Sequence, residues 1–314
     1  MIERCKGSSG DAEIRALFER NGWRHFDRYY PFLRAAGGTS WVARDDAGAV
    51  YGHVGVLPRT FRGPATAVRG GVITDVVVDP AHRDFFSAVR LLRRVMEDLQ
   101  ALGICAFAYS DPLPGARAVL AAAGLEPIGV MDRFVLPLVA PYLALWRWLA
   151  VGGGPALSVT DAPQAPPPED AQLVLGLPPA EYVHAVRVEA EYGARLGEGG
   201  HWIVCRDGAA PVGTACCGGD EDRGGGTLAL RELRWDERRT TVAAVIAAIA
   251  RWARARGYRK VSTVTLVPSR MARALRRSGC VRRPGGLTLY TRALDGAPPP
   301  PDAWLVTALD SSGW

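Results

Sequence analysis

The sequence is short of lysine and lacks a hydrophobic run long enough to cross a membrane. Lys6 and Lys260 are the only lysines among 38 basic residues, which face 32 acidic ones and leave a net charge of +6. The most apolar stretch, residues 142–157, is interrupted by Arg147 and by Gly-Gly-Gly-Pro, whereas a bilayer span needs about 20 apolar residues. We therefore expect no membrane partner, and no dense basic run with interleaved aromatics indicates nucleic acid.

Cysteine is also sparse, and its spacing excludes zinc-bound and disulfide-framed folds. The six cysteines include no Cys-x-x-Cys pair and no cluster with histidine at zinc-ligand spacing. Disulfide frameworks belong to small secreted domains rather than to chains of 314 residues. The N-terminal segment MIERCKGSSGDAEIR has no apolar core of the kind that a signal peptide needs. We expect reduced thiols, no metal site and a cytoplasmic protein.

The remaining composition is that of an ordinary globular protein of two domains. Apolar residues make up 48% of the chain and charged residues 22%, which excludes global disorder. At roughly 100–200 residues per domain, the length predicts two domains. Residues 151–169 are rich in Gly and Pro and have linker composition. We expect an N-terminal domain over 1–150, this linker, and a C-terminal domain over 170–314.

The two halves of the sequence repeat one plan. Trp41 and Gly52 in the first half match Trp202 and Gly213 in the second, at the same separation within each half. Each pair lies in a segment that has the pattern of strand, polar turn and strand. An internal repeat of this length predicts duplicated domains.

A helix, a strand, a second helix and a final strand pair are expected to follow in each half. The helices should span Phe86–Leu102 and Thr241–Arg256, and each ends at a glycine, as helix C-termini often do. The expected strands are Ile104–Tyr109 and Lys260–Leu266, with closing strand pairs over Glu126–Leu138 and Val281–Leu294. This order predicts mixed α/β (α+β) domains rather than an all-parallel sheet.

The segment Gly71–Leu92 is the richest in functional signals. A β-branched strand runs into Asp79-Pro80, and a short polar loop then leads into a helix. The N-terminus of a helix presents unpaired backbone N–H groups and a positive dipole end, which together bind anions. Arg83 would add a guanidinium to the same anion. An ordinary strand–loop–helix connection has the same pattern.

This segment and the order of elements resemble the GNAT superfamily of acyl-CoA-dependent N-acyltransferases. The pyrophosphate signature of the family is Arg or Gln, two residues, Gly, one residue, then Gly or Ala, after a Val-x-Pro strand end. The strand end here is Val78-Asp79-Pro80, and Arg83 and Ala88 match the signature. Phe86 stands where the family has the glycine that lets the backbone approach the diphosphate.

The resemblance implies two tandem GNAT-like mixed-sheet domains and an acyl donor, acetyl-CoA or another acyl-CoA. The residues that it implies for the donor site lie at the end of one strand and the start of the next helix: Val76, Val77, Val78, Arg83, Asp84, Phe85, Phe86, Ser87 and Ala88. The equivalent segment of the second half lacks Val-x-Pro and has Trp235, Asp236 and Glu237, whose carboxylates would repel a diphosphate. We therefore expect one donor site, in the first half.

Three residues are candidates for the chemistry that the resemblance implies. Acyl transfer to an amine needs a deprotonated amine and a protonated or stabilised thiolate. Asp75, in the strand that should line the donor cleft, is the candidate base, and Tyr109 is the candidate acid. His53, on the neighbouring strand, should lie near the acceptor. Each also has a structural interpretation, as a hydrogen-bonded carboxylate, a core tyrosine and a buried histidine.

The sequence departs from the family pattern at one catalytic position and offers no covalent nucleophile. In the family, the tyrosine that often serves as general acid lies five residues before the aromatic of a Gly-Phe pair; here Gly124-Leu125 takes the place of that pair, with Leu120 at the tyrosine position. No Ser/His/Asp or Cys/His triad is recognisable. Direct attack of the amine on the thioester is therefore the expected route.

Three functions are open at this point. The first is an N-acyltransferase that acts on the amine of a small molecule. The second is a Fem-type transferase that takes its acyl group from aminoacyl-tRNA, which is the one case with a nucleic-acid partner. The third is a catalytically silent GNAT-like binding protein, suggested by Phe86 and Leu120. We expect a monomer or homodimer, with the aromatic tail around Trp304 and Trp314 packed against the body.

Overall fold

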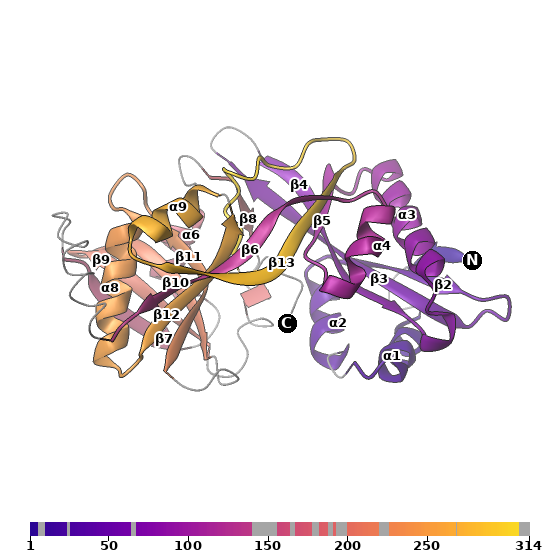
Figure 1. Cartoon of the computed structure of the whole chain (residues 1–314), viewed down its shortest axis with the longest axis horizontal. Helices are drawn as coiled ribbons and strands as arrows, with labels where there is room; N and C mark the ends of the chain where they lie inside the picture. The colour runs from indigo at the N-terminus through magenta and orange to yellow at the C-terminus, as the bar shows by residue number, and fades with distance from the viewer. Residues whose placement is uncertain are drawn as a thin grey trace.

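A computed structural model shows a molecule of two lobes that share one β-sheet (Figure 1). The structure describes residues 1–5, 10–23, 26–63, 67–139, 156–163, 167–177, 182–187, 191–192, 200–219, 226–267 and 269–307. Among these residues, no helix combines the length and apolar character needed to cross a bilayer.

The first half forms the lobe that carries the N-terminus. Its elements in chain order are β1 (Ile2–Arg4), α1 (Asp11–Arg20), α2 (Phe26–Ala35), β2 (Thr39–Arg44), β3 (Val50–Arg62), β4 (Ala67–Val78), α3 (Phe85–Ala101), β5 (Phe107–Ser110), α4 (Arg117–Ala122) and β6 (Glu126–Pro137). Residues of α1 and α2 pack on one face of the sheet and residues of α3 and α4 on the other, so that each face has its own core. The sequence pattern fixes this layering, because strand residues alternate between the two faces.

The second half forms the other lobe on a similar plan. Its elements are β7 (Ser158–Pro163), α6 (Glu169–Gly176), β8 (His184–Val186), β9 (His201–Asp207), β10 (Ala210–Gly219), β11 (Thr227–Trp235), α8 (Val242–Ala255), β12 (Lys260–Val267), α9 (Arg270–Arg277) and β13 (Val281–Ala293). The helix α8 has an almost wholly apolar inner face, which covers the core of this lobe.

Residues at equivalent positions have the same structural roles in the two halves, which confirms the predicted duplication. A side chain at Gly52 would meet Leu91 of α3, and one at Gly213 would meet Val245 of α8, so both glycines let a helix approach the sheet. Asp84 caps α3 by accepting a hydrogen bond from the backbone N–H three residues on, and Thr241 caps α8 in the same way.

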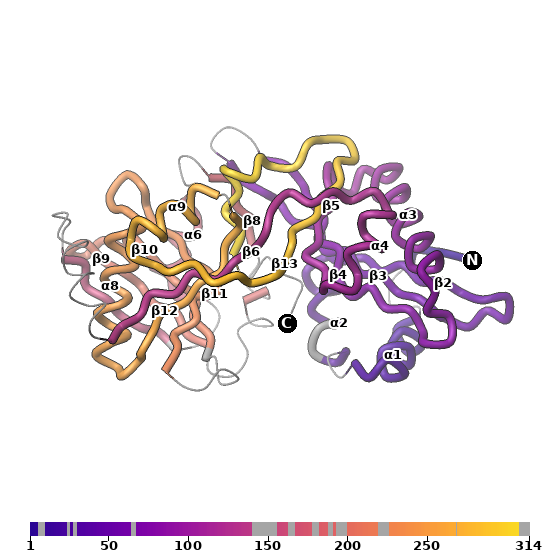
Figure 2. The backbone as a smooth tube through the Cα atoms, viewed as in Figure 1, coloured from indigo at the N-terminus to yellow at the C-terminus, as the bar shows by residue number. Residues whose placement is uncertain are grey.

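The two halves exchange their final strands. Twelve strands of the thirteen-stranded sheet follow the order β1-β2-β3-β4-β5-β13-β6-β12-β11-β10-β9-β7, and the thirteenth, β8, pairs with β3. The last strand of the second half, β13, thus pairs with β5 of the first half, and β6 pairs with β12 of the second half. The two strands also pair with each other, and Figure 2 shows them crossing between the lobes in opposite directions.

This exchange corrects the expected closing strand pairs. Glu126–Pro137 and Val281–Ala293 are single long strands, and neither closes the sheet of its own half. Part of the expected linker is also ordered, since Ser158–Pro163 forms β7 and pairs with β9 at the sheet edge. Residues 151–155 and 164–166 lie outside the described residues, and the domain boundaries stay a prediction.

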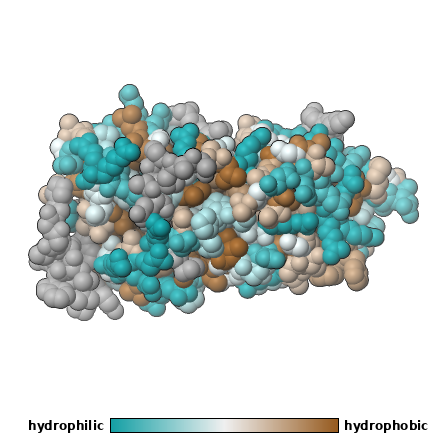
Figure 3. All heavy atoms as spheres, turned by 90° about the horizontal axis from the view of Figure 1, so that it is seen from above, coloured by the Kyte–Doolittle hydropathy of each residue, from teal (hydrophilic) through white to brown (hydrophobic). Residues whose placement is uncertain are grey.

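The C-terminal segment packs at the junction of the lobes. Trp304 is fully buried, and its ring makes edge contacts with Phe61, Phe107 and Tyr109 of the first half. It also forms a bridge with Val183 of the second half. Hydrophobic residues show near the middle of the face in Figure 3, between two more hydrophilic ends. Trp314 lies outside the described residues.

Candidate active site at the end of the β4–β5 ladder

The strands β4 and β5 pair over a short stretch and then part. The parallel ladder joins Gly70, Gly71 and Val72 to Phe107, Ala108 and Tyr109. β4 runs on to Val78, whereas β5 ends at Ser110. The edge of β4 beyond Val72, which includes Val76, Val77 and Val78, is therefore not paired with β5.

A β-bulge at Asp75 follows three residues after the last pair of β4 with β5. The register with β3 shifts by one residue here, and Asp75 has a backbone φ of 50°, in the left-handed region. Bulges of this kind occur beside active sites, where they redirect a side chain. Asp75 is half-buried. The strand that carries the candidate base thus bends at that base.

His53 holds the bulge from inside the core. Its Nδ1 donates a hydrogen bond to the carbonyl oxygen of Asp75 at 3.0 Å, and its Nε2 accepts one from the hydroxyl of Ser40 at 3.1 Å. The ring is fully buried, and burial lowers the pKa of His53 to about 4, so the imidazole is neutral near pH 7. The structure therefore joins His53 to Asp75, through the backbone.

The predicted donor segment lies at the start of α3, where its helix end is already capped. The carboxylate of Asp84 accepts hydrogen bonds from the backbone N–H and the hydroxyl of Ser87, both at 2.6 Å. These bonds lower the pKa of the Asp84 carboxyl. Phe85 and Phe86 are exposed, at 45% and 70%. A diphosphate at this helix end would therefore have to share or displace a carboxylate.

Arg83 is exposed at this helix end and is oriented by α1. Its guanidinium donates a hydrogen bond to the side-chain oxygen of Asn21, just after α1. Arg20, the last residue of α1, donates a hydrogen bond to the carboxylate of Asp79 at 2.6 Å. The same carboxylate accepts a hydrogen bond from the backbone N–H of Ala81. The polar loop between β4 and α3 is thus fixed by α1 and by its own turn.

Tyr109, the candidate acid, is buried where the β4–β5 ladder ends. Its side chain is 1% exposed, and its hydroxyl accepts a hydrogen bond from Nη1 of Arg59 at 2.9 Å. Arg59 forms an ion pair with Glu191 of the second half. Sequence reasoning did not find these two residues, because an arginine in a strand and a glutamate near a loop have the pattern of surface residues.

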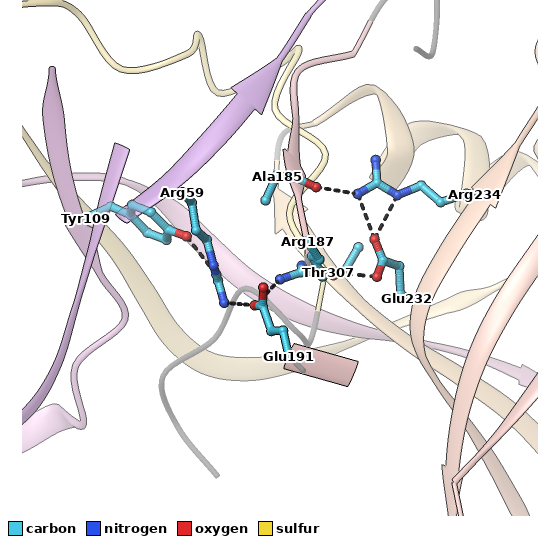
Figure 4. A network of polar contacts seen from close by, with 8 residues as sticks. All are labelled: Arg59, Tyr109, Ala185, Arg187, Glu191, Glu232, Arg234 and Thr307. Carbon is cyan, nitrogen blue, oxygen red and sulfur yellow. Dashed lines mark hydrogen bonds and ion pairs between the residues drawn. The ribbon is translucent and has the colours of Figure 1, made fainter. Parts of the chain in front are cut away.

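The ion pair of Arg59 continues as a chain of buried charges across the junction of the lobes (Figure 4). Glu191 also pairs with Arg187 at 2.8 Å, Arg187 with Glu232 at 3.1 Å, and Glu232 with Arg234 at 2.7 Å. We call Arg59, Glu191, Arg187, Glu232 and Arg234 the seam network. All five side chains are at most 4% exposed.

Comparison with known proteins decides the family of the first half. Residues 11–124 match the model of the acetyltransferase (GNAT) family. The first half of this chain carries a GNAT domain. None of the curated proteins matches the sequence significantly.

Solved structures extend the likeness over almost the whole chain. A probable N-acyltransferase from Enterococcus faecalis aligns with a TM-score of 0.69 and 12% identity, covering 94% of this chain and 73% of that one. A GCN5-related N-acetyltransferase from Anabaena variabilis aligns with a TM-score of 0.66 and 15% identity over the same shares. A tandem GNAT protein from the clavulanic acid biosynthesis pathway aligns with a TM-score of 0.52 and 16% identity, covering 95% and 100%. The likeness confirms the predicted fold of tandem GNAT-like mixed-sheet domains.

The second half repeats the geometry of the GNAT domain with different contacts. The ladder between β11 and β12 also ends early, at the pair Leu230–Thr263. Counted back from the residues that pair with Gly52 and Gly213, Glu232 on β11 takes the place of Asp75 on β4. The seam network holds this carboxylate between two arginines, so it is already neutralised.

The carboxylate at the turn after β11 does not distinguish the second half from the first. Asp236 accepts a hydrogen bond from the N–H of Arg238 at 3.0 Å, as Asp79 does from Ala81 in the GNAT domain. A carboxylate at this turn is therefore common to both halves and cannot by itself exclude a diphosphate from the second.

Within the described residues, no group of three His, Cys, Asp or Glu side chains could hold a metal.

His53 should make the stability of the GNAT domain depend on pH. Unfolded histidine takes up a proton near its ordinary pKa of 6.5, whereas native His53 has a pKa of about 4. Between these values the unfolded chain binds more protons, so stability falls as the pH falls. From about pH 7 to about pH 4.5, we expect wild type to lose about 2–3 kcal/mol more than His53→Gln. Urea denaturation at several pH values measures this difference.

The matched control for this prediction is His82→Gln, because the side chain of His82 is exposed. This variant should lose stability on acidification in parallel with wild type. Parallel curves for His53→Gln and wild type would contradict the neutral, bulge-holding role of His53.

Proposed function

We propose that the protein transfers an acyl group from an acyl-CoA to the amine of a small molecule, at the GNAT domain in the first half. The observation that carries the proposal is that β4 and β5 part after the pair Val72–Tyr109 and that β4 then bulges at Asp75 before its last residues lead, through a loop, to the N-terminus of α3. A strand edge that has lost its partner can pair with the amide groups of an extended ligand. The helix end beyond it favours a phosphate.

The residues present fit a bound acyl-CoA in part. The backbone of Val76–Val78 offers an edge for the amides of its pantetheine arm, and the first turn of α3 with Arg83 offers an anion site. The carboxylate of Asp84 already occupies that turn. A bound diphosphate would therefore compete with Asp84, and the exposed rings of Phe85 and Phe86 would lie beside it.

The chemistry assigned to the chain uses two proton-transfer groups. Asp75, at the bulge, takes a proton from the attacking amine, directly or through water. Tyr109, at the last pair of the ladder, gives a proton to the departing sulfur. His53 supports this arrangement by fixing the backbone of Asp75. Bound acyl-CoA supplies the reactive thioester, and no covalent acyl-enzyme is needed.

A thiol-release screen tests this function. Purified protein is mixed with a panel of acyl-CoAs and small amines, and free thiol is measured over time. Amine-dependent release supports the proposal. Salt-sensitive co-purification of tRNA, with no thiol release, would favour the Fem-type alternative. The absence of both would favour a silent binding protein.

Two substitutions at the start of α3 should change acyl-CoA affinity in opposite directions. Arg83→Ala removes a charge-assisted hydrogen bond and should weaken binding about tenfold to a hundredfold. Asp84→Asn keeps a good helix cap but removes a negative charge from the anion site, so it should tighten binding. Isothermal calorimetry measures both constants and should find one site per chain.

Thr241→Asn in the second half is the control, because it changes the matching cap of α8. It should leave the acyl-CoA affinity unchanged. A stoichiometry of two, or equal effects of Thr241→Asn and Asp84→Asn, would contradict a single site in the first half.

A further inference from the structure

We propose that Arg59, held by Glu191 of the second half, is a positioning residue for the acid Tyr109, so that the second half controls proton delivery in the first. This inference rests on the proposed function, because it assigns a partner to the acid of the same site. It gives the second half a role in catalysis.

The geometry places Arg59 between the two halves of the chain. It lies on β3, on the face that also carries His53 and Phe61, because alternate residues of a strand face one way. Its Nη1 donates to the Tyr109 hydroxyl at 2.9 Å, and its Nη2 pairs with Oε1 of Glu191. Two nitrogens of one guanidinium thus each reach one partner in a fixed fork geometry.

The direction of the hydrogen bond suits an acid. A guanidinium has donors and no acceptor, so the phenolic oxygen of Tyr109 accepts and its own proton points away from Arg59. When Tyr109 gives up that proton, the guanidinium faces the phenolate oxygen and stabilises its charge. Because the site is buried, this charge–charge attraction is weakly screened.

The step balances in atoms and charge. The amine nitrogen bonds to the carbonyl carbon of the thioester, and Asp75 takes one proton from that nitrogen. The carbon–sulfur bond breaks, its electron pair goes to sulfur, and sulfur takes the proton of Tyr109. The phenolate and the protonated Asp75 then exchange one proton through solvent, which restores both groups.

The seam network explains why Arg59 stays in place. A buried guanidinium needs a compensating charge, and Glu191 supplies it from 132 residues further along the chain. Arg187 fixes Glu191 from behind and is itself fixed by Glu232. The charged groups of the seam network that stand nearest to Tyr109 are therefore Arg59 and, behind it, Glu191 (Figure 4).

A double-mutant cycle between Arg59 and Tyr109 separates positioning from a merely structural role. Arg59→Lys should lower kcat about tenfold or more, with the KM for acyl-CoA changed less than about twofold, because the acid loses its partner. In a Tyr109→Phe background the same substitution should cost no further activity. Arg44→Lys, in an ion pair on β2, is the control and should keep wild-type activity in both backgrounds. Additive losses from Arg59→Lys and Tyr109→Phe would overturn the proposal.

A titration independent of activity completes the test. The ultraviolet difference between wild type and Tyr109→Phe follows the ionisation of Tyr109 alone. Removing the guanidinium in Arg59→Met should move the midpoint of this titration to higher pH, and Glu191→Gln should move it to lower pH. Unmoved midpoints in folded variants would overturn the role of Arg59. Moved midpoints with no acyl transfer in wild type would sink the proposed function and leave the Arg59–Tyr109 coupling standing.

Discussion

Replacing Glu232 with alanine should lower the free energy of unfolding by about 3–5 kcal/mol, the usual cost of breaking a buried ion pair by removing one partner. Glu232 is 1% exposed and accepts hydrogen bonds from Arg234 at 2.7 and 2.8 Å and from Arg187 at 3.1 Å. Without it, two buried guanidinium groups lose a carboxylate, and their charges repel each other. Urea denaturation followed by circular dichroism measures the loss.

Glu13→Ala is the matched control for Glu232→Ala. Glu13 also accepts two hydrogen bonds from one arginine, Arg44, at 2.7 and 2.8 Å, but its side chain is 46% exposed. Exposed ion pairs contribute about 1 kcal/mol or less. Losses of equal size for the two variants would show that burial does not set the strength of the seam network.

Asp75→Asn should lower kcat by about 10²–10⁴-fold, the range that general acid–base catalysis contributes. The amide cannot take a proton from the amine. Asparagine tolerates the left-handed backbone that Asp75 adopts, so the bulge and its hydrogen bond from His53 should persist. Steady-state kinetics should show the loss in kcat, while calorimetry should show unchanged acyl-CoA affinity.

Asp45→Asn serves as the control for this substitution, because Asp45 only stabilises the turn between β2 and β3. It should keep wild-type kcat. If Asp75→Asn retains activity within about twofold of this control, Asp75 is not the base, and solvent or another group must take the proton.

The individual helices and strands of the fold could be predicted from the sequence. The helices α3 and α8 and the strand β12 lie within one residue of their predicted bounds. Gly103 and Gly257, which were expected to end the two long helices, both have positive φ. Caps, glycines and apolar periodicity act over a few residues, so a sequence carries them directly. The strand β5 starts three residues later than expected, at Phe107, because the turn after Gly103 takes the intervening residues.

The site residues that depend on local sequence could be predicted, and those that depend on contacts between distant segments could not. The donor segment after β4 was found because strand, loop and helix are contiguous in sequence. The bulge at Asp75 was not, since it depends on how β4 pairs with β3. The seam network was missed because its members come from distant segments, and a single arginine gives no sign that a glutamate 132 residues away will cover it.

The sequence by itself determined the duplication, the mixed α/β plan and the segment that carries the candidate donor site. Only the tertiary structure decided which strands pair. β6 and β13 occupy matching positions in the repeated plan, so each has a pattern that suits either half of the sheet, and the pairing energy of a strand depends on its neighbours. In the folded chain, the exchange joins the halves into one sheet. The pairing of β8 of the second half with β3 of the first brings the segment that carries Glu191 against Arg59. Burial then fixes those charges, because removing them from water makes an unpaired partner costly.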